Sequence, residues 1–206
     1  HEIIKQKKEI AMNTSGKLKG KDLINIGIYA AIYCVIMTAV AMLGFIPIMM
    51  PMLCVLVPLL GGIPYMLFMT KVDKFGMLTI YAIIIGLFLW ITGMGYWPFL
   101  FGIVFGLLAD LIAKSGNYKS SSKATLSGSV FDIILFGNFV PLFINAHEYF
   151  VTRQSFGQEY IDSLSEIMSH KWLIPAMIIS CLVCGWIGGI IGKSVLQKHF
   201  EKAGIA

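Results

Sequence analysis

The chemistry-bearing residues of this chain are concentrated in one apolar stretch, residues 127–148, which carries Asn138 and Asn145 and ends on Glu148. A carboxamide both donates and accepts hydrogen bonds, so two of them can orient a bound polar ring. Polar residues at membrane depth are costly and rarely face lipid. Two roles therefore stand side by side, a ligand site and hydrogen bonds that lock neighbouring helices. At 100° per residue, one face collects Phe131, Ile134, Asn138, Pro141, Asn145 and Glu148.

Aromatic residues form the second group with binding potential. Tyr96 and Trp97 belong to a glycine-containing turn at residues 92–98, and Trp90 precedes it. Such residues either anchor a protein at the membrane surface or form a stacking edge for a flat ligand. Taken with the amides, they predict a substrate-binding site near the outer face of the membrane, made of Tyr96, Trp97, Asn138, Asn145, Trp90 and Glu148.

The elements that must position these residues are membrane helices. Hydrophobic residues make up 57% of the chain and charged residues 13%, with a mean hydropathy of +0.80, whereas soluble domains carry about 25% charged residues. The net charge of +5 gives no nucleic-acid patch, because the lysines lie between apolar segments. The sequence predicts an all-α integral membrane protein in a lipid bilayer, a six-transmembrane-helix bundle with spans at 23–43, 45–70, 76–93, 97–113, 126–147 and 172–195.

The basic residues predict the orientation. A six-span topology places fourteen of the 16 basic residues on the side of the termini and leaves only Arg153 and Lys171 on the other. The positive-inside rule then makes both termini cytoplasmic. We expect Met12 to be the natural start, with residues 1–11 either non-native or an upstream extension. The predicted divisions are a lysine-rich tail at 1–21, a membrane domain at 22–196 containing an external loop at 148–171, and a second tail at 197–206.

Three local patterns add expectations. In the external loop, Tyr160, Leu164, Ile167 and Met168 recur at helical spacing and predict a short amphipathic helix, either a lid over a pocket or an idle surface helix. The prolines and glycines of residues 45–70 predict a kinked or partly unwound span. Finally, we expect Asp110 and Asp132 to pair with lysines of the intervening loop, namely Lys114, Lys119 and Lys123.

Small residues mark two helix faces. One face is in the last span and consists of Cys181, Gly185, Gly188 and Gly192. It permits a close helix crossing. The other small-residue face is in the first span. It serves either packing within the bundle or docking of another membrane subunit. The residues predicted to contact such a partner are Gly27, Ala30, Ala31, Cys34 and Thr38.

Motifs of catalysis are missing from the sequence. There is no glycine-rich loop with Lys-Ser or Lys-Thr for nucleotides and no HExxH helix. The four histidines are scattered, and the four cysteines lie in apolar segments, where a thiol acts as a small hydrophobic group. We therefore expect a protein that is not an enzyme and that has no metal site and no cofactor.

Three segments carry a family resemblance: LKGKDLINIGIYAAIY from residue 18, PLLGGIPYMLFMTKVDKFG from residue 58 and GLLADLIAKSGNYKS from residue 106. Together they resemble the treponemal–streptococcal (Trep_Strep) family of small bacterial membrane proteins. This family is grouped with the substrate-binding S components of energy-coupling factor (ECF) transporters.

The resemblance implies a high-affinity binding subunit of an ECF-type ABC importer in the bacterial plasma membrane. Such a subunit captures a vitamin or similar micronutrient at the outer face and delivers it with a transmembrane T component and two ATPase subunits. The T component would meet the small-residue face of the first span. Two alternatives remain, a self-sufficient secondary transporter or facilitator joined as a homo-oligomer through the glycine face of span six, and a ligand-free membrane scaffold.

Overall fold

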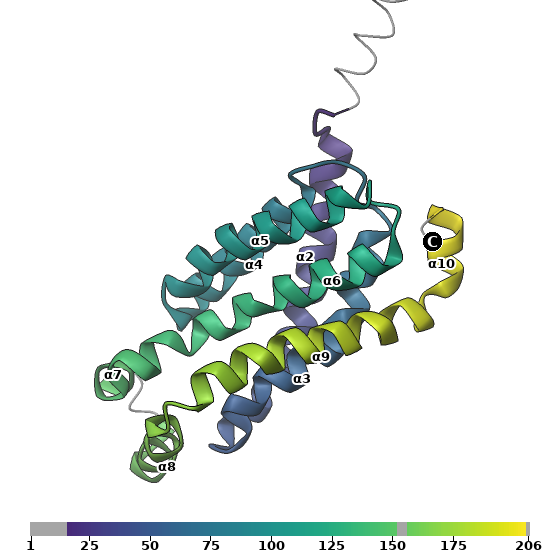
Figure 1. The fold of residues 1–206 in the computed structure, drawn as a ribbon. Coiled ribbons are helices and arrows are strands. Elements are labelled where there is room, and N and C mark those ends of the chain that lie inside the picture. Colours follow the sequence, from purple (N-terminus) through teal and green to yellow (C-terminus); the bar gives the residue numbers. More distant parts are fainter. Residues whose placement is uncertain (1–15, 152–155, 205–206) are drawn as a thin grey trace, which may run out of the picture.

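The computed structural model describes residues 16–151 and 156–204. The predicted tail up to residue 15, including the proposed start at Met12, and Arg153 of the external loop lie outside these residues. The described elements are helical, and Figure 1 shows them as one bundle. In chain order they are α2 (Gly20–Ala41), η1 (Met42–Phe45), α3 (Met49–Met69), α4 (Met77–Leu89), η2 (Trp90–Met94), α5 (Trp97–Ser115), α6 (Ser121–Phe131), η3 (Asp132–Asn138), α7 (Val140–Val151), α8 (Gln158–Ser169), α9 (Leu173–Val195) and α10 (Gln197–Ala203).

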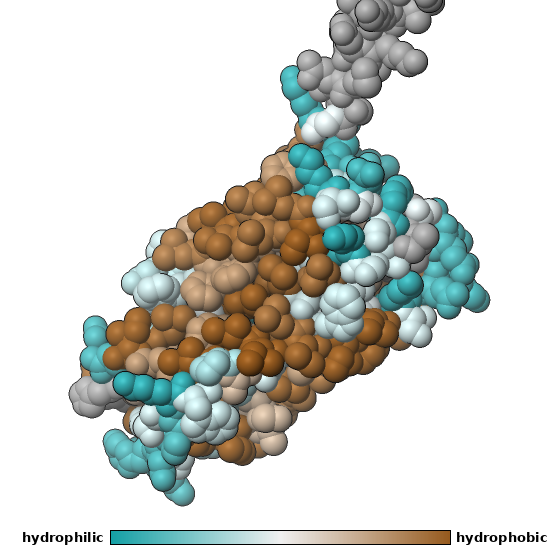
Figure 2. Space-filling view, in the orientation of Figure 1, coloured by the Kyte–Doolittle hydropathy of each residue, from teal (hydrophilic) through white to brown (hydrophobic). Residues whose placement is uncertain are grey.

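Six helical segments are long and apolar enough to cross a membrane, which confirms the predicted fold class. Each lies within a few residues of a predicted span: Gly20–Phe45, Met49–Met69, Met77–Met94, Trp97–Ser115, Ser121–Ala146 and Leu173–Val195. Figure 2 shows the result as a hydrophobic band across the middle of the molecule, with hydrophilic residues gathered at its two ends. The described chain ends lie at one end of the bundle, and α7 and α8 lie at the other (Figure 1).

The closest helix crossing joins α3 to α9. A Cβ atom added to Gly62 would collide with the backbone of Gly188, and one added to Gly192 would lie 2.5 Å from the Gly62 carbonyl oxygen. Gly185 packs closely against Asp132 of η3 and Ser129 of α6, and Gly189 packs against Thr125 of α6. The predicted close crossing of the last span is therefore confirmed. Because this glycine face is buried within one chain, it cannot serve as the homo-oligomer interface of the facilitator alternative.

The second span is not unwound between Met49 and Met69, whereas the kink stays a prediction. α3 continues as one helix through Pro58 and Pro64, without an unwound segment. The glycines that suggested unwinding are instead contact points, since Gly61 faces the Tyr33 ring and Gly62 faces α9.

The fifth span is interrupted, as Gly137 and Pro141 suggested. α6 gives way to the 3-10 segment η3 at Asp132, and α7 begins after Phe139. A 3-10 helix turns about 20° more per residue than an α-helix. The polar face drawn for one continuous helix is therefore wrong, and residues before and after η3 point in different directions.

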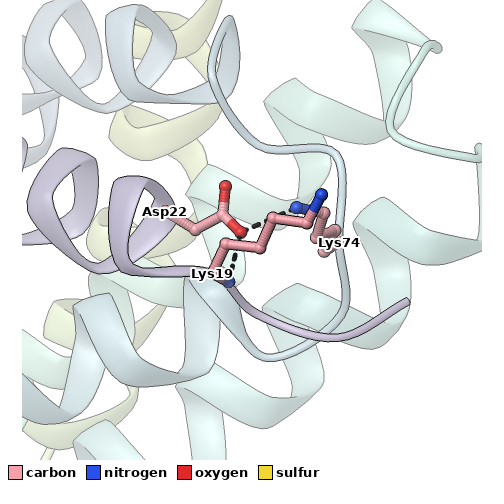
Figure 3. A network of polar contacts seen from close by, with 3 residues as sticks. All are labelled: Lys19, Asp22 and Lys74. Carbon is pink, nitrogen blue, oxygen red and sulfur yellow. Dashed lines mark hydrogen bonds and ion pairs between the residues drawn. The ribbon is translucent and has the colours of Figure 1, made fainter. Parts of the chain in front are cut away.

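Polar contacts secure the end of the bundle that carries the termini. The Asp22 carboxylate accepts hydrogen bonds from the Lys19 backbone N–H and from Lys74 Nζ, both at 2.7 Å (Figure 3). This bond raises the pKa of Lys74. It fixes the start of α2 to the loop between α3 and α4.

The expected lysine partners of Asp110 and Asp132 are wrong. Asp110 Oδ2 accepts from the backbone N–H groups of Gly76 and Thr79 and from the Thr79 hydroxyl, at 2.8–3.1 Å. Its Oδ1 accepts from the Tyr118 hydroxyl at 2.8 Å. Asp110 of α5 thus caps the first turn of α4, whose N–H groups lack partners within the helix. Burial and the neighbouring carboxylate raise the pKa of Tyr118, which remains a donor.

Candidate ligand site

An apolar cavity lies at the end of the bundle opposite the termini. It is a cavity of about 240 Å³. The last turns of α2, η1, the first turns of α3 and the end of η3 form most of its wall. The helix ends meet there because η1 turns the chain back from α2 into α3 and η3 redirects the fifth span.

One polar atom in this wall has no partner. Asn138, the last residue of η3, lines the cavity, and its side-chain Oδ1 is buried without a hydrogen bond. A buried carbonyl oxygen without a partner costs about 1–3 kcal/mol. Sequence analysis singled out Asn138, but it placed the residue on the same face as Asn145. The additional rotation of η3 separates the two.

The amphipathic helix predicted in the external loop is confirmed as α8. Tyr160, Leu164 and Met168 form its buried face, with Ile167 half-buried beside them. The Tyr160 hydroxyl donates to the Gly44 carbonyl of η1 at 2.5 Å. Burial raises the pKa of Tyr160 to about 12, so the hydroxyl stays protonated.

α8 therefore adjoins the cavity through an aromatic chain. Phe156 lies in the cavity wall, stacks on Tyr160 with ring centroids 4.9 Å apart, and contacts Phe45 at 5.8 Å. Gly44 and Phe45, which Tyr160 and Phe156 contact, also line the cavity. Of the two predicted roles for this helix, the position next to the cavity favours that of a cover.

Four of the six predicted binding residues meet in a separate, more polar cleft. Tyr96, Trp97, Asn145 and Glu148 line it, and its volume is about 290 Å³. Met94 lines both the cleft and the cavity, so the two are neighbours. Asn138, another of the predicted binding residues, lines the cavity and not the cleft. That these predicted residues bind a ligand stays a prediction.

Local geometry explains this arrangement. The Tyr96 and Trp97 rings stack on one another with centroids 5.3 Å apart. At Asn145 the backbone of α7 is extended, with φ −155° and ψ 89°. Its Oδ1 accepts from the Glu148 backbone N–H at 3.2 Å, and its Nδ2 donates to Glu148 Oε2 at 3.3 Å. Asn145 therefore caps the start of the helical segment that follows the kink in α7.

Trp90 lies apart from the other predicted binding residues. Its ring packs against Phe99 at 5.4 Å, and it is about half exposed. It lines neither the cavity nor the cleft. This position fits the alternative prediction for Trp90, an aromatic side chain at the membrane surface.

A buried polar cluster in the bundle core was missed. Tyr33 of α2 donates to Asp132 Oδ1 at 3.2 Å, and Tyr65 of α3 pairs with Ser127 at 2.8 Å. Ser129 donates to the Leu182 carbonyl of α9. The signal was a polar residue every second or third position, from Thr125 to Asp132, within an apolar span. Such residues tie helices together across the core.

The five residues predicted to contact a partner all line one groove on the surface of α2. It has a volume of about 660 Å³, and Ile84 and Phe88 of α4 form its other wall. Ala30 and Cys34 form its buried floor, whereas Gly27, Ala31 and Thr38 are exposed. An exposed strip of small side chains permits another helix to approach closely. Whether a partner binds there stays a prediction.

The side chains of the described residues include no group of three His, Cys, Asp or Glu placed to hold a metal ion. What the geometry provides is an apolar cavity with one buried amide, a neighbouring polar cleft and a groove on the first span. These features belong to an all-helical, six-span integral membrane protein. The chain is a member of the Trep_Strep family, described as hypothetical bacterial integral membrane proteins, whose family model matches residues 20–202. No curated protein and no solved structure matches the chain significantly.

Proposed function

We propose that this protein is a membrane-embedded binding subunit for a small molecule, acting as the S component of an ECF-type importer. The observation that carries the proposal is the cavity beside α8, whose described wall is apolar except for the side chains of Asn138 and Thr38. Enclosed apolar pockets with few polar groups are typical ligand sites. The role is binding and delivery rather than catalysis.

The position of the cavity supports capture from outside the cell. It lies at the end of the bundle opposite the termini, next to the cleft lined by Tyr96 and Trp97. Of the described lysines, only Lys171 belongs to that end. The positive-inside rule then assigns the lysine-rich end to the cytoplasm and the cavity to the outer side of the plasma membrane.

The groove on α2 supports the second half of the proposal. A subunit that only binds its ligand needs partners for transport, here a transmembrane T component and two ATPase subunits. A partner helix can approach Gly27 closely, because a Cβ atom added there would meet nothing within 4 Å. We assign this groove to the T component.

The test of ligand binding uses the purified full chain. Native mass spectrometry identifies a co-purifying small molecule, and a thermal-shift screen of vitamins, their precursors and nucleobases identifies binders. A ligand present at about 1,000 times its Kd adds about 4 kcal/mol to the free energy of unfolding. A molecule found in this way names the substrate class directly.

A pair of variants on α3 locates the site. Leu53→Trp fills the cavity and should abolish ligand retention and the thermal shift. Leu60→Trp places the same ring on an exposed part of the same helix and should leave both unchanged. Absence of any small molecule in both assays, or equal ligand binding by the two variants, would contradict the proposed site. Uptake by this chain alone, without ATPases, would favour the facilitator alternative.

A further inference from the structure

A polar pocket at the lysine-rich end of the bundle has no part in the proposed function. Its volume is about 460 Å³, and it lies where the start of α2 meets the loop between α3 and α4. Polar and charged residues line it: Lys19, Lys21, Asp22, Asn25, Thr70, Lys71, Asp73 and Lys74. We propose that this pocket binds the headgroup of an anionic phospholipid.

The pocket carries an excess of positive charge. Four lysines and two aspartates line it, which leaves two positive charges in excess. One lysine and one aspartate neutralise each other, because Lys74 Nζ lies 2.7 Å from Asp22 Oδ2 (Figure 3). The ammonium groups of Lys19, Lys21 and Lys71 form no ion pair with a described residue. All three of these residues are exposed, so their charges are available to an anion.

The position of the pocket selects an anion of the membrane. Gly20 begins the first candidate span and Met69 ends the second, so the pocket lies at the edge of the membrane-crossing region. Figure 2 shows hydrophilic residues at this end of the molecule, directly beside the hydrophobic band. Lipid headgroups occupy this depth in a bilayer, next to the hydrocarbon core. Basic pockets between membrane helices bind anionic headgroups at this depth.

Helix α2 provides contacts for both parts of a phospholipid. Its residues Lys21, Ile24, Asn25 and Ile28 follow the i, i+3, i+4, i+7 spacing of one helix face. Ile24 and Ile28 are 63% and 51% exposed, and they lie farther into the span than Lys21. A lipid phosphate that accepts hydrogen bonds from Lys21 and Asn25 places its acyl chains along these two isoleucines. Free phosphate would use only the polar half of this face.

The test measures lipid binding to the purified full chain by native mass spectrometry in detergent. Phosphatidylglycerol and phosphatidylcholine with the same acyl chains are titrated separately. Both carry a phosphate, but the choline group of the second adds a positive charge that the lysines repel. We expect the Kd of phosphatidylglycerol to be at least about fivefold lower, the effect of one charge. Inorganic phosphate, added as a competitor at the concentration of the lipid, should not displace it.

Matched double variants locate the site. Lys21→Gln with Lys71→Gln removes two unpaired charges and should raise the Kd of phosphatidylglycerol about 25-fold, which is about fivefold for each lysine. Lys198→Gln with Lys202→Gln removes the same charge from exposed positions of α10, outside the pocket, and should leave this Kd nearly unchanged. Lys21→Arg with Lys71→Arg keeps the charge and should retain binding, which separates loss of charge from loss of folding.

Four results would overturn the inference. Equal Kd values for the two lipids, or an unchanged Kd in Lys21→Gln with Lys71→Gln, would exclude the pocket as an anionic headgroup site. Equal losses in the two glutamine variants would indicate general attraction to a basic surface. Displacement of the lipid by inorganic phosphate would indicate a site for free phosphate. The pocket shares no residue with the cavity or the groove, so this inference and the proposed function fail separately.

Discussion

Nearly every polar side chain in the membrane-spanning core of this protein has a partner. Asp132 receives a hydrogen bond from Tyr33, and Ser127 pairs with Tyr65. Of the described residues, only Tyr81 and Asn138 have buried side-chain oxygens without one. The Tyr81 ring belongs to an aromatic cluster and stacks on Phe68, with ring centroids 4.4 Å apart. It lines neither the cavity nor the cleft. Asn138 lines the cavity, although its Oδ1 has almost no accessible surface.

Asp110 gives a prediction at the same scale that does not depend on any ligand. Asp110→Ala leaves two N–H groups at the start of α4 and the Thr79 and Tyr118 hydroxyls without their acceptor. We expect a loss of about 2–4 kcal/mol in the free energy of unfolding, measured by chemical denaturation in detergent. Thr79→Val removes one of these four bonds and should cost about 1 kcal/mol. Equal stability of Asp110→Ala and the wild type would refute the capping role.

At the scale of the elements, alanine substitutions at two glycines, one on a buried and one on an exposed helix face, should have opposite effects on stability. Gly62→Ala inserts a methyl group into the backbone of α9 at Gly188, where no flexible side chain can yield. We expect a clear fall in apparent Tm, by an overpacking cost of about 1–3 kcal/mol. Gly27→Ala adds the same methyl group to open space on α2 and should stabilise the helix by up to about 1 kcal/mol.

Thermal unfolding of both variants in the same detergent checks the pair. The matched chemistry removes helix propensity as an explanation for any difference between them. A Gly62→Ala variant as stable as Gly27→Ala would show that α3 and α9 can separate without cost.

The elements also show what the sequence could and could not predict. Span positions followed from hydropathy, which depends only on local composition, and α8 followed from the spacing of Tyr160, Leu164 and Met168. The direction of side chains beyond η3 did not follow, because a change from 3.6 to 3.0 residues per turn leaves no mark in an apolar pattern. The partner of Asp132 and the α4 partners of Asp110 were equally hidden, since they are more than thirty residues away in the sequence; Tyr118, eight residues after Asp110, is the exception.

The candidate site was predictable to the same limited degree. Tyr96 and Trp97 stand at the start of one span, and Asn145 and Glu148 stand at the end of the next; consecutive spans run in opposite directions, so these residues meet at one end of the bundle. The cavity itself was not foreseen, because its wall is built from ordinary apolar residues such as Met37. Only three-dimensional packing shows that these residues enclose a space instead of filling it.

At the scale of the whole molecule, the cavity and the groove adjoin. Thr38 of α2 and Met42 of η1 line both. A helix docked in the groove would therefore lie against residues that also contact a bound ligand. This shared wall gives a direct physical route by which a partner and a ligand influence one another.

The groove yields the last prediction, on assembly. Ala31→Leu adds bulk to the exposed edge of the groove, where a partner helix would have to approach closely. We expect it to reduce co-purification with a co-expressed T component and its ATPases at least tenfold, and to reduce uptake accordingly. Ligand binding by the isolated subunit should stay within about twofold of wild type, because Ala31 does not line the cavity. Val183→Phe, on the exposed surface of α9, adds comparable bulk away from the groove and should leave assembly intact. Normal assembly of Ala31→Leu would exclude the groove as the docking surface, while equal loss in both variants would point to a general effect on membrane packing.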